Sequence, residues 1–168
     1  QAIAAVGNLD RELNGGPPAG RRSELVATRL MADGCVRRWR SRAALSGARI
    51  ELLWGGPDAL VRGDGVALAA ALENLIVNAI EHGGPEIEVS GRAVADRVRI
   101  VVKDSGAEAR PAGKPDSPVE TLARLSGRGS HGHGLAVAEQ VARDHGGRLE
   151  TVFSGGGSEV TLLLPKSS

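Results

Sequence analysis

Residues 64–82 form the segment that most constrains what this chain can fold into. Apolar side chains recur there every three or four positions, the spacing of a buried helical stripe, at Leu68, Leu72, Leu75, Ile76 and Ala79. Asn74, Asn78 and His82 stand one helical turn apart on a different face. The segment therefore predicts a helix that packs on a core with one face and presents polar side chains with another.

Segments of alternating polarity on both sides of this helix predict β-strands. The predicted strands are residues 49–54, 86–94, 97–103, 148–153 and 159–164. Ala95-Asp96 would join the second and third strands in a hairpin. Two more helices are predicted at residues 23–45, with Ser23 as the N-cap, and at about 134–145. Helices and strands in this order favour a two-layer α/β sandwich, with a mixed β-sheet covered on one face by helices.

The chain of 168 residues is long enough for one domain with a single core. Residues 1–16 carry a short helical pattern that begins without a methionine and ends in Asn14-Gly15-Gly16. We therefore expect residues 1–16 to be the remnant of an upstream helix and its linker. Residues 17–168 would form the domain itself.

Charge and cysteine content exclude several classes of function. Lysine and arginine number 21 against 20 aspartates and glutamates, which predicts no strong field for nucleic acid. No apolar run approaches the roughly 20 residues that span a bilayer, so we expect no membrane insertion. The lone Cys35 excludes an internal disulfide and fits the reducing cytoplasm.

Two of the polar motifs suit a nucleotide. The carboxamide oxygens of Asn74 and Asn78 could ligate Mg²⁺, a cation that prefers oxygen, although solvated or packing asparagines would give the same pattern. Asp104, followed by Ser105-Gly106 at a strand end, could accept a hydrogen bond from the amine of adenine. An ordinary structural turn is the alternative interpretation of that tripeptide.

A glycine-rich run, residues 129–135, directly precedes the last predicted helix. Unpaired amides and the dipole at a helix N-terminus attract phosphate. The run lacks the Gly-Lys-Ser/Thr ending of a P-loop, so phosphate would bind by another geometry. Residues 105–132 are too long for an ordinary connection, and such segments are typically lids or disordered.

In this order, the motifs resemble those of the GHKL nucleotide-binding superfamily (the Bergerat fold), specifically the ATP-binding catalytic domain of bacterial sensor histidine kinases. The resemblance covers residues 23–165 and implies a flexible ATP lid. Residues 73–83 are similar to the asparagine box and residues 104–106 to the first glycine box. Residues 132–135 are similar to the second glycine box and residues 156–158 to the last.

The resemblance implies ATP and Mg²⁺ as cofactors, with Asn74 and Asn78 as catalytic residues and Asn78 as the metal ligand. The nucleotide contacts that it implies come from Asp104 and Gly106 around adenine, from Gly132 and Gly134 at the phosphates, and from Leu135 in the pocket wall. A lysine common near the end of the asparagine box is replaced by Glu81. A phosphate contact is therefore expected from His82 or Arg128 instead.

Other departures from the family pattern are Glu108, where a second glycine is usual in the first glycine box, and the absence of a recognisable phenylalanine box. The segment 119–125 occupies the place of that box and predicts a short lid helix. Hydrolytic members of the superfamily carry a glutamate where this chain has Asn74. Glu73 is rotated away from that position on the helix and does not replace it.

The function implied is transfer of the γ-phosphoryl group of Mg-ATP to a histidine on a dimerisation domain outside this chain. Residues 1–16 would then end the second dimerisation helix, and the full-length protein would meet a response regulator. Two alternatives stay open. One is a serine kinase that inhibits a sigma factor, and the other is a degenerate nucleotide-binding or scaffold module, suggested by Glu81 and Glu108.

Overall fold

The computed structural model describes residues 23–106, 131–154 and 156–168 of the chain. Predictions for residues 1–16 and for the lid, residues 107–130, lie outside the described residues. The described elements in chain order are β1 (Glu24–Ala27), α2 (Thr28–Leu45), β2 (Arg49–Gly55), β3 (Leu60–Gly63), α3 (Gly65–His82), β4 (Glu86–Val94), β5 (Arg97–Asp104), α5 (His131–Asp144), β6 (Arg148–Ser154) and β7 (Gly157–Pro165).

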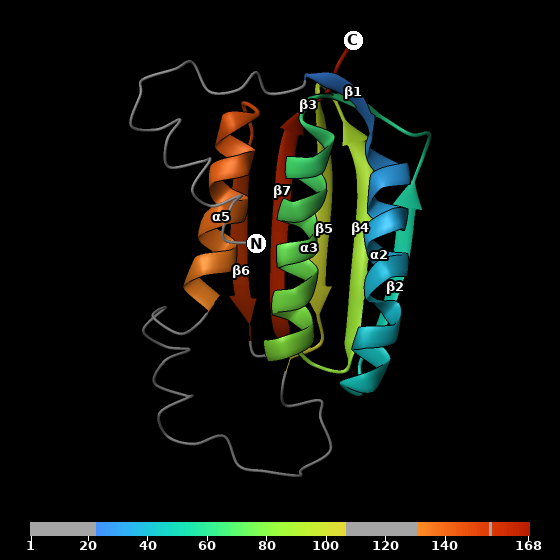
Figure 1. Cartoon of the computed structure of the whole chain (residues 1–168), viewed down its shortest axis with the longest axis vertical. Helices are drawn as coiled ribbons and strands as arrows, with labels where there is room; N and C mark the ends of the chain where they lie inside the picture. Colours follow the sequence, from blue (N-terminus) through green and yellow to red (C-terminus); the bar gives the residue numbers. More distant parts are fainter. Residues whose placement is uncertain (1–22, 107–130, 155) are drawn as a thin grey trace, which may run out of the picture.

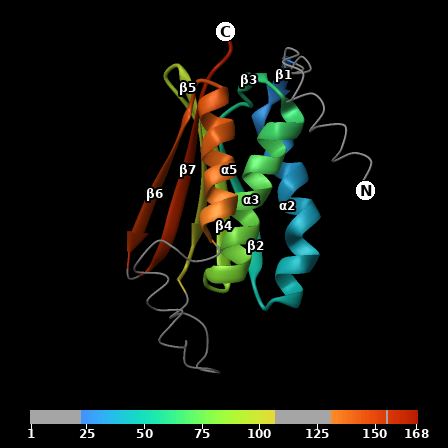
Figure 2. The ribbon, with the colours of Figure 1, turned by 60° about the vertical axis from the view of Figure 1, so that its left-hand side comes forward.

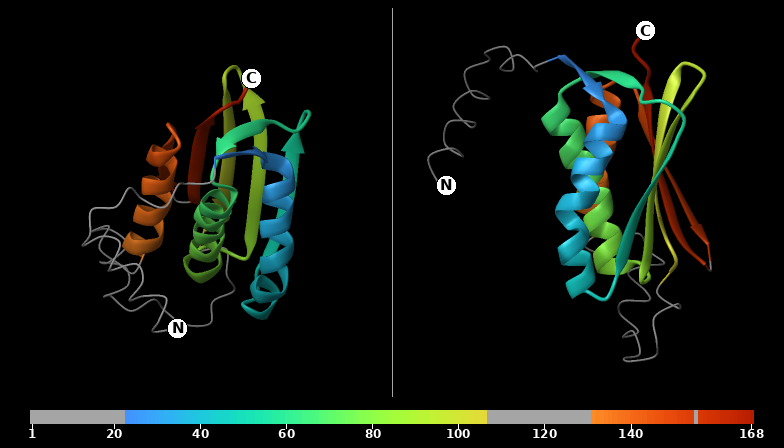
Figure 3. Two further views of the ribbon diagram at one scale, coloured as in Figure 1. Left: turned by 45° about the horizontal axis from the view of Figure 1, so that its top comes forward. Right: turned by 90° about the vertical axis from the view of Figure 1, so that its right-hand side faces the viewer.

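A five-stranded sheet in the order β2-β4-β5-β7-β6 forms one layer of the molecule. Strand β2 runs parallel to β4, whereas the other neighbouring pairs are antiparallel. Helices α2, α3 and α5 lie together on one face of this sheet (Figures 1 and 3). The predicted two-layer sandwich with a mixed sheet is confirmed.

The core lies between the sheet and α3, the helix that Figure 2 shows between α2 and α5. The predicted stripe of α3 is buried, with exposed fractions of 5% or less at Leu68, Leu72, Leu75, Ile76 and Ala79. The strands meet it with alternate apolar residues, all fully buried, at Val89, Val98, Ile100, Leu162 and Leu164. Burial of each such side chain contributes roughly 1.5–3 kcal/mol, so α3 is fixed mainly by this contact.

The start of the first predicted helix was wrong. Residues 24–27 form β1, which pairs antiparallel with β3 and places Val26 opposite Val61. Helix α2 begins at Thr28 without a local side-chain cap. Its first turn is held from a distance, because the Asp58 carboxylate accepts a hydrogen bond from the Arg29 amide at 2.8 Å. The helix-like pattern after Ser23 was overridden by this strand pairing.

The start of α3 agrees with the sequence, because the Asp64 side chain caps it by accepting from the amides of Val66 and Ala67 at 3.0 and 3.1 Å. The hairpin of β4 and β5 also forms as predicted, with Ala95 in the left-handed region at φ 54°. Helix α5 begins about three residues before the predicted start.

His145 connects the end of α5 to the start of α3. Its Nδ1 lies 2.7 Å from the carbonyl oxygen of Val141, so this nitrogen carries the hydrogen and donates it. Its Nε2 then accepts a hydrogen bond from the Asp64 amide at 3.0 Å. A Cβ atom on Gly63 would lie only 2.2 Å from the imidazole Cδ2, so glycine at 63 gives the ring its space.

Replacing His145 with alanine leaves the partly buried Asp64 amide without its acceptor. We expect His145→Ala to lower the free energy of unfolding by about 1–3 kcal/mol in chemical denaturation. Arg143→Ala is the matched control, because it removes only an exposed ion pair with Glu139 and should cost less than about 1 kcal/mol. Equal losses in the two variants would contradict this role for His145.

Candidate functional site

One end of the sandwich brings four chain segments together: the end of α3, the end of β5, the start of α5 and the turn before β7 (Figure 1). Strands β4 and β5 join here through Ser105, whose amide donates to the Glu86 carbonyl and whose hydroxyl accepts from the Glu86 amide. The predicted site residues that the structure describes lie on α3, on α5, and at the end of β5 or directly after it. The fold thus collects at one end residues that are far apart in the sequence.

Asp104 ends β5 and is only 5% exposed. Its Oδ1 accepts a hydrogen bond from the Gly106 amide at 2.8 Å, and its Oδ2 accepts one from the Ser158 hydroxyl. A carboxylate has about four lone-pair positions, so two donors leave it able to accept from another. Asp104 is therefore a fixed acceptor with capacity for one more donor.

Glycines around Asp104 allow the backbone to approach it closely. A Cβ atom on Gly83, which follows α3, would lie 2.7 Å from both Cβ and Cγ of Asp104. Gly157 has φ 127°, and a Cβ atom there would lie 2.0 Å from the Asp104 carbonyl oxygen. Any other residue at these two positions would displace the carboxylate or the strand that carries it.

Ser158 also holds Asp104 in place, and the sequence did not predict this role. Its position among Gly155-Gly156-Gly157 indicated a flexible hairpin turn, and it stands 54 residues from Asp104. The only signal in the sequence was its place in the last glycine box. In the structure, its hydroxyl links the start of β7 to the end of β5.

The predicted polar face of α3 carries Asn74, Asn78 and His82, and all three are partly buried. Gly134 of α5 lies against Asn74, because a Cβ atom on Gly134 would be 3.9 Å from that of the asparagine. The His82 ring lies 3.7 Å from the Glu81 carboxylate. Among the described residues, no hydrogen bond joins either asparagine to Asp104.

For the other predicted residues, the structure gives either a position on α5 or no position at all. Leu135 is partly buried and packs against the core from α5. Gly132 lies in the first turn of α5, and Arg128 lies outside the described residues. The site that the described residues define is therefore Asp104 with its glycines at the end of α3, and Asn74 lies against Gly134 of α5 farther along the same helix.

Glu73 is directed toward α2, where it forms an ion pair with Arg38. It also lies beside Cys35, which is buried. Burial and, secondly, the Glu73 carboxylate raise the pKa of the Cys35 thiol to about 11. Glu73 is thus directed toward α2, whereas Asn74 lies against Gly134 of α5.

The raised pKa gives a test of this packing. A free thiol, with a pKa of 9.0, gains little more thiolate above pH 10, whereas the thiolate of Cys35 in the folded chain should continue to increase through pH 11. We therefore expect alkylation of folded Cys35 by iodoacetamide, followed by mass spectrometry, to be slow at pH 8 and to accelerate up to pH 11. The same rate in folded and urea-unfolded chain at pH 8 would show that the thiol is not buried.

A sequence profile for the family described as "Histidine kinase-, DNA gyrase B-, and HSP90-like ATPase" matches residues 63–168, more than half of the chain. This chain belongs to that family. The matched residues include α3, Asp104 and Ser158, the elements that form the site.

Curated relatives are longer proteins. The sensor-like histidine kinase SenX3 of Mycobacterium tuberculosis is 35% identical over 136 residues, which are 75% of this chain and 33% of SenX3. The alginate biosynthesis sensor protein KinB of Pseudomonas aeruginosa is 30% identical over 61% of this chain and 18% of KinB. The chain thus spans a third or less of the length of these relatives.

Solved structures agree with the fold. The ATP binding domain of PrrB from Mycobacterium tuberculosis superposes with a TM-score of 0.64 at 25% identity, covering 87% of this chain and 98% of the PrrB chain. The catalytic domain of the histidine kinase ThkA superposes with a TM-score of 0.68 at 21% identity, over 86% and 97% of the two chains. In the part of this chain that the structure describes, no helix is both long and apolar enough to cross a membrane.

Proposed function

We propose that this chain is the ATP-binding catalytic domain of a sensor histidine kinase. It binds Mg-ATP and transfers the γ-phosphoryl group to a histidine on a separate dimerisation domain. The observation that carries the proposal is the Asp104 carboxylate, held by Gly106 and Ser158 at the glycine-rich end of a family ATPase domain. Relatives named as histidine kinases, SenX3 and PrrB, support this activity over that of an anti-sigma-factor serine kinase.

Asp104 recognises the adenine base in this proposal. Its free lone pairs accept from the exocyclic amine, and the missing side chains at Gly83 and Gly106 let the backbone pack closely around the carboxylate that reads the base. Leu135 supplies an apolar wall from α5. A buried carboxylate with two internal donors is a rigid acceptor, because neither oxygen can rotate without breaking a hydrogen bond.

The phosphates lie along α3 and the start of α5 in this proposal. The packing of Gly134 against Asn74 supports it, because it brings the α5 N-terminus next to the asparagine face. Gly132 and Gly134 admit the phosphates, and Arg128 or His82 contributes a cationic contact. Asn78, with Asn74 beside it, offers carboxamide oxygens to Mg²⁺, which when bound neutralises phosphate charge.

The domain transfers phosphate rather than hydrolysing ATP in this proposal. Its carboxylate nearest the asparagines in sequence, Glu73, is paired with Arg38 and so is not available to activate water. Catalysis then depends on positioning and charge stabilisation. The acceptor histidine belongs to the dimerisation domain. Residues 1–16 would form the end of the second helix of that domain. The response regulator, as partner of the full-length kinase, and the cytoplasmic location stay predictions.

The role of Asp104 can be measured by isothermal titration with ATP. Asp104→Asn keeps the shape but removes the charged acceptor, and should weaken binding by roughly tenfold to a hundredfold. Glu51→Gln is the matched control, since it neutralises an exposed carboxylate on β2 and should leave the affinity unchanged. An Asp104→Asn variant that binds ATP as tightly as the parent chain would disprove the assignment.

Phosphoryl transfer can be followed by mixing the chain, labelled ATP and the dimerisation domain of its parent kinase. We expect label on histidine of the added domain and none on this chain, at a modest rate because the tether is absent. Asn78→Ala should abolish the Mg²⁺-dependent transfer with an unchanged circular dichroism spectrum. Acid-labile phosphate on the isolated chain, or full transfer by Asn78→Ala, would contradict the proposed division of roles.

A further inference from the structure

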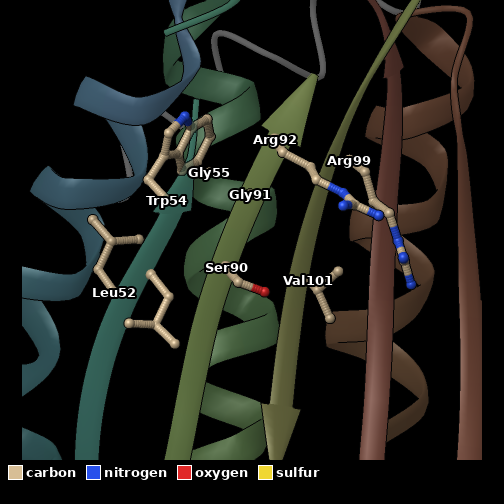
Figure 4. Close-up of a pocket in the computed structure, with 9 residues that line it drawn as sticks. Leu52, Trp54, Gly55, Ser90, Gly91, Arg92, Arg99 and Val101 are labelled. Atoms are coloured by element: carbon tan, nitrogen blue, oxygen red, sulfur yellow. The ribbon is translucent and has the colours of Figure 1, made fainter. Parts of the chain in front are cut away.

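The sheet face that the helices leave uncovered carries a hollow of about 490 Å³ near the β2 edge (Figure 4). On β4, Val89 and Gly91 are buried against the helices, so Ser90 and Arg92 face the other side. The hollow is lined on this side by Leu53, Ser90, Arg92, Arg99 and Val101. It therefore lies apart from the site at Asp104, whose side chain faces the helix layer.

The strand register arranges these residues in two neighbouring rows across β2, β4 and β5. One row is apolar at its ends and holds Leu53, Ser90 and Val101. The next row holds Gly55, Arg92 and Arg99. Small residues in each row, Ser90 and Gly55, create the hollow and leave Leu53 52% exposed.

The second row carries two arginines, and the neighbouring residues that the structure describes neutralise only one of them. Arg99 forms an ion pair with Glu159, with Nη2 and Oε1 3.0 Å apart. Arg92, directly opposite Arg99, forms no ion pair or hydrogen bond with any residue that the structure describes. Like charges in opposed positions on neighbouring strands are unfavourable, and Figure 4 shows both side chains extending over the same face of the sheet. An oxyanion here would relieve the repulsion.

We propose that this hollow binds an extended acidic segment of a partner protein. One acidic side chain of that segment pairs with Arg92 and Arg99, because guanidinium groups bind carboxylates in a planar, two-bond geometry. An apolar side chain two residues away covers Leu53. Residues two apart in an extended chain lie about 6.8 Å apart on one face, which equals the separation of the two rows.

A peptide segment fits the hollow better than a free anion, because an inorganic ion would satisfy the arginines and leave Leu53 exposed. The Ser90 hydroxyl, which has no partner among the described residues, lies in the middle of the row that holds Leu53 and can donate to the peptide. This inference concerns a different face of the sheet and does not depend on the proposed kinase function.

The test is a titration of the isotopically labelled full chain with the peptide acetyl-Leu-Ala-Glu-amide, followed by two-dimensional NMR. We expect saturable shifts of the amide signals of Ser90, Arg92, Arg99 and Val101. Acetyl-Leu-Ala-Gln-amide should bind at least tenfold more weakly, and Arg92→Gln should lower the affinity for the acidic peptide by a similar factor. Arg62→Gln, on the exposed side of β3, is the matched control and should have no effect.

The variant Ser90→Asp and the anion sulfate give two further tests of the hollow. Ser90→Asp places a carboxylate inside the hollow, and should abolish peptide binding while raising the thermal midpoint of unfolding. No saturable shifts, equal binding of the neutral peptide, or sulfate binding as tightly as the peptide at matched ionic strength would overturn the proposal. ATP added to the same sample reports separately on the nucleotide site, through the signals of Gly106 and Ser158.

Discussion

The end of the domain that carries the candidate site depends on the hydrogen bonds of the Asp104 carboxylate. A charged group that is only 5% exposed needs internal donors, and the Gly106 amide and Ser158 hydroxyl supply them. The Gly106 bond fixes the turn after β5, and the Ser158 bond joins the end of β5 to the start of β7. They also explain the glycine at 157, because a side chain there would collide with the Asp104 backbone.

The position of Asp104 depends in turn on the helix layer. Gly83, directly after α3, touches the carboxylate, so a shift of α3 along its axis would displace it. At the opposite end of α3, His145 connects its first turn to the end of α5. The two helices are thus linked at one end by a histidine and meet near the asparagine face at the other. Changes at His145 should reach the proposed nucleotide site through the relative position of these helices.

Local patterns predicted much of this structure. The buried stripe of α3, its start near residue 64, the β4–β5 hairpin and the layer arrangement all follow from local sequence patterns. Local patterns did not predict the strand at residues 24–27, because its pairing with β3 and the support of α2 by Asp58 come from about 30 to 40 residues away. The Ser158 contact, across 54 residues, and the His145 contact, across 81, were likewise beyond local patterns. Asp104 was identified as a candidate because its chemistry and strand-end position are both visible in the sequence.

Comparison of ATP with GTP on the unmodified chain tests the role of Asp104 most directly. Adenine presents an amine at the position where guanine presents a carbonyl oxygen, and a carboxylate that already has two donors would repel that oxygen. GTP should bind more weakly than ATP by about tenfold to a hundredfold, because one charged hydrogen bond is lost. Equal affinities for the two nucleotides would show that Asp104 does not read the base.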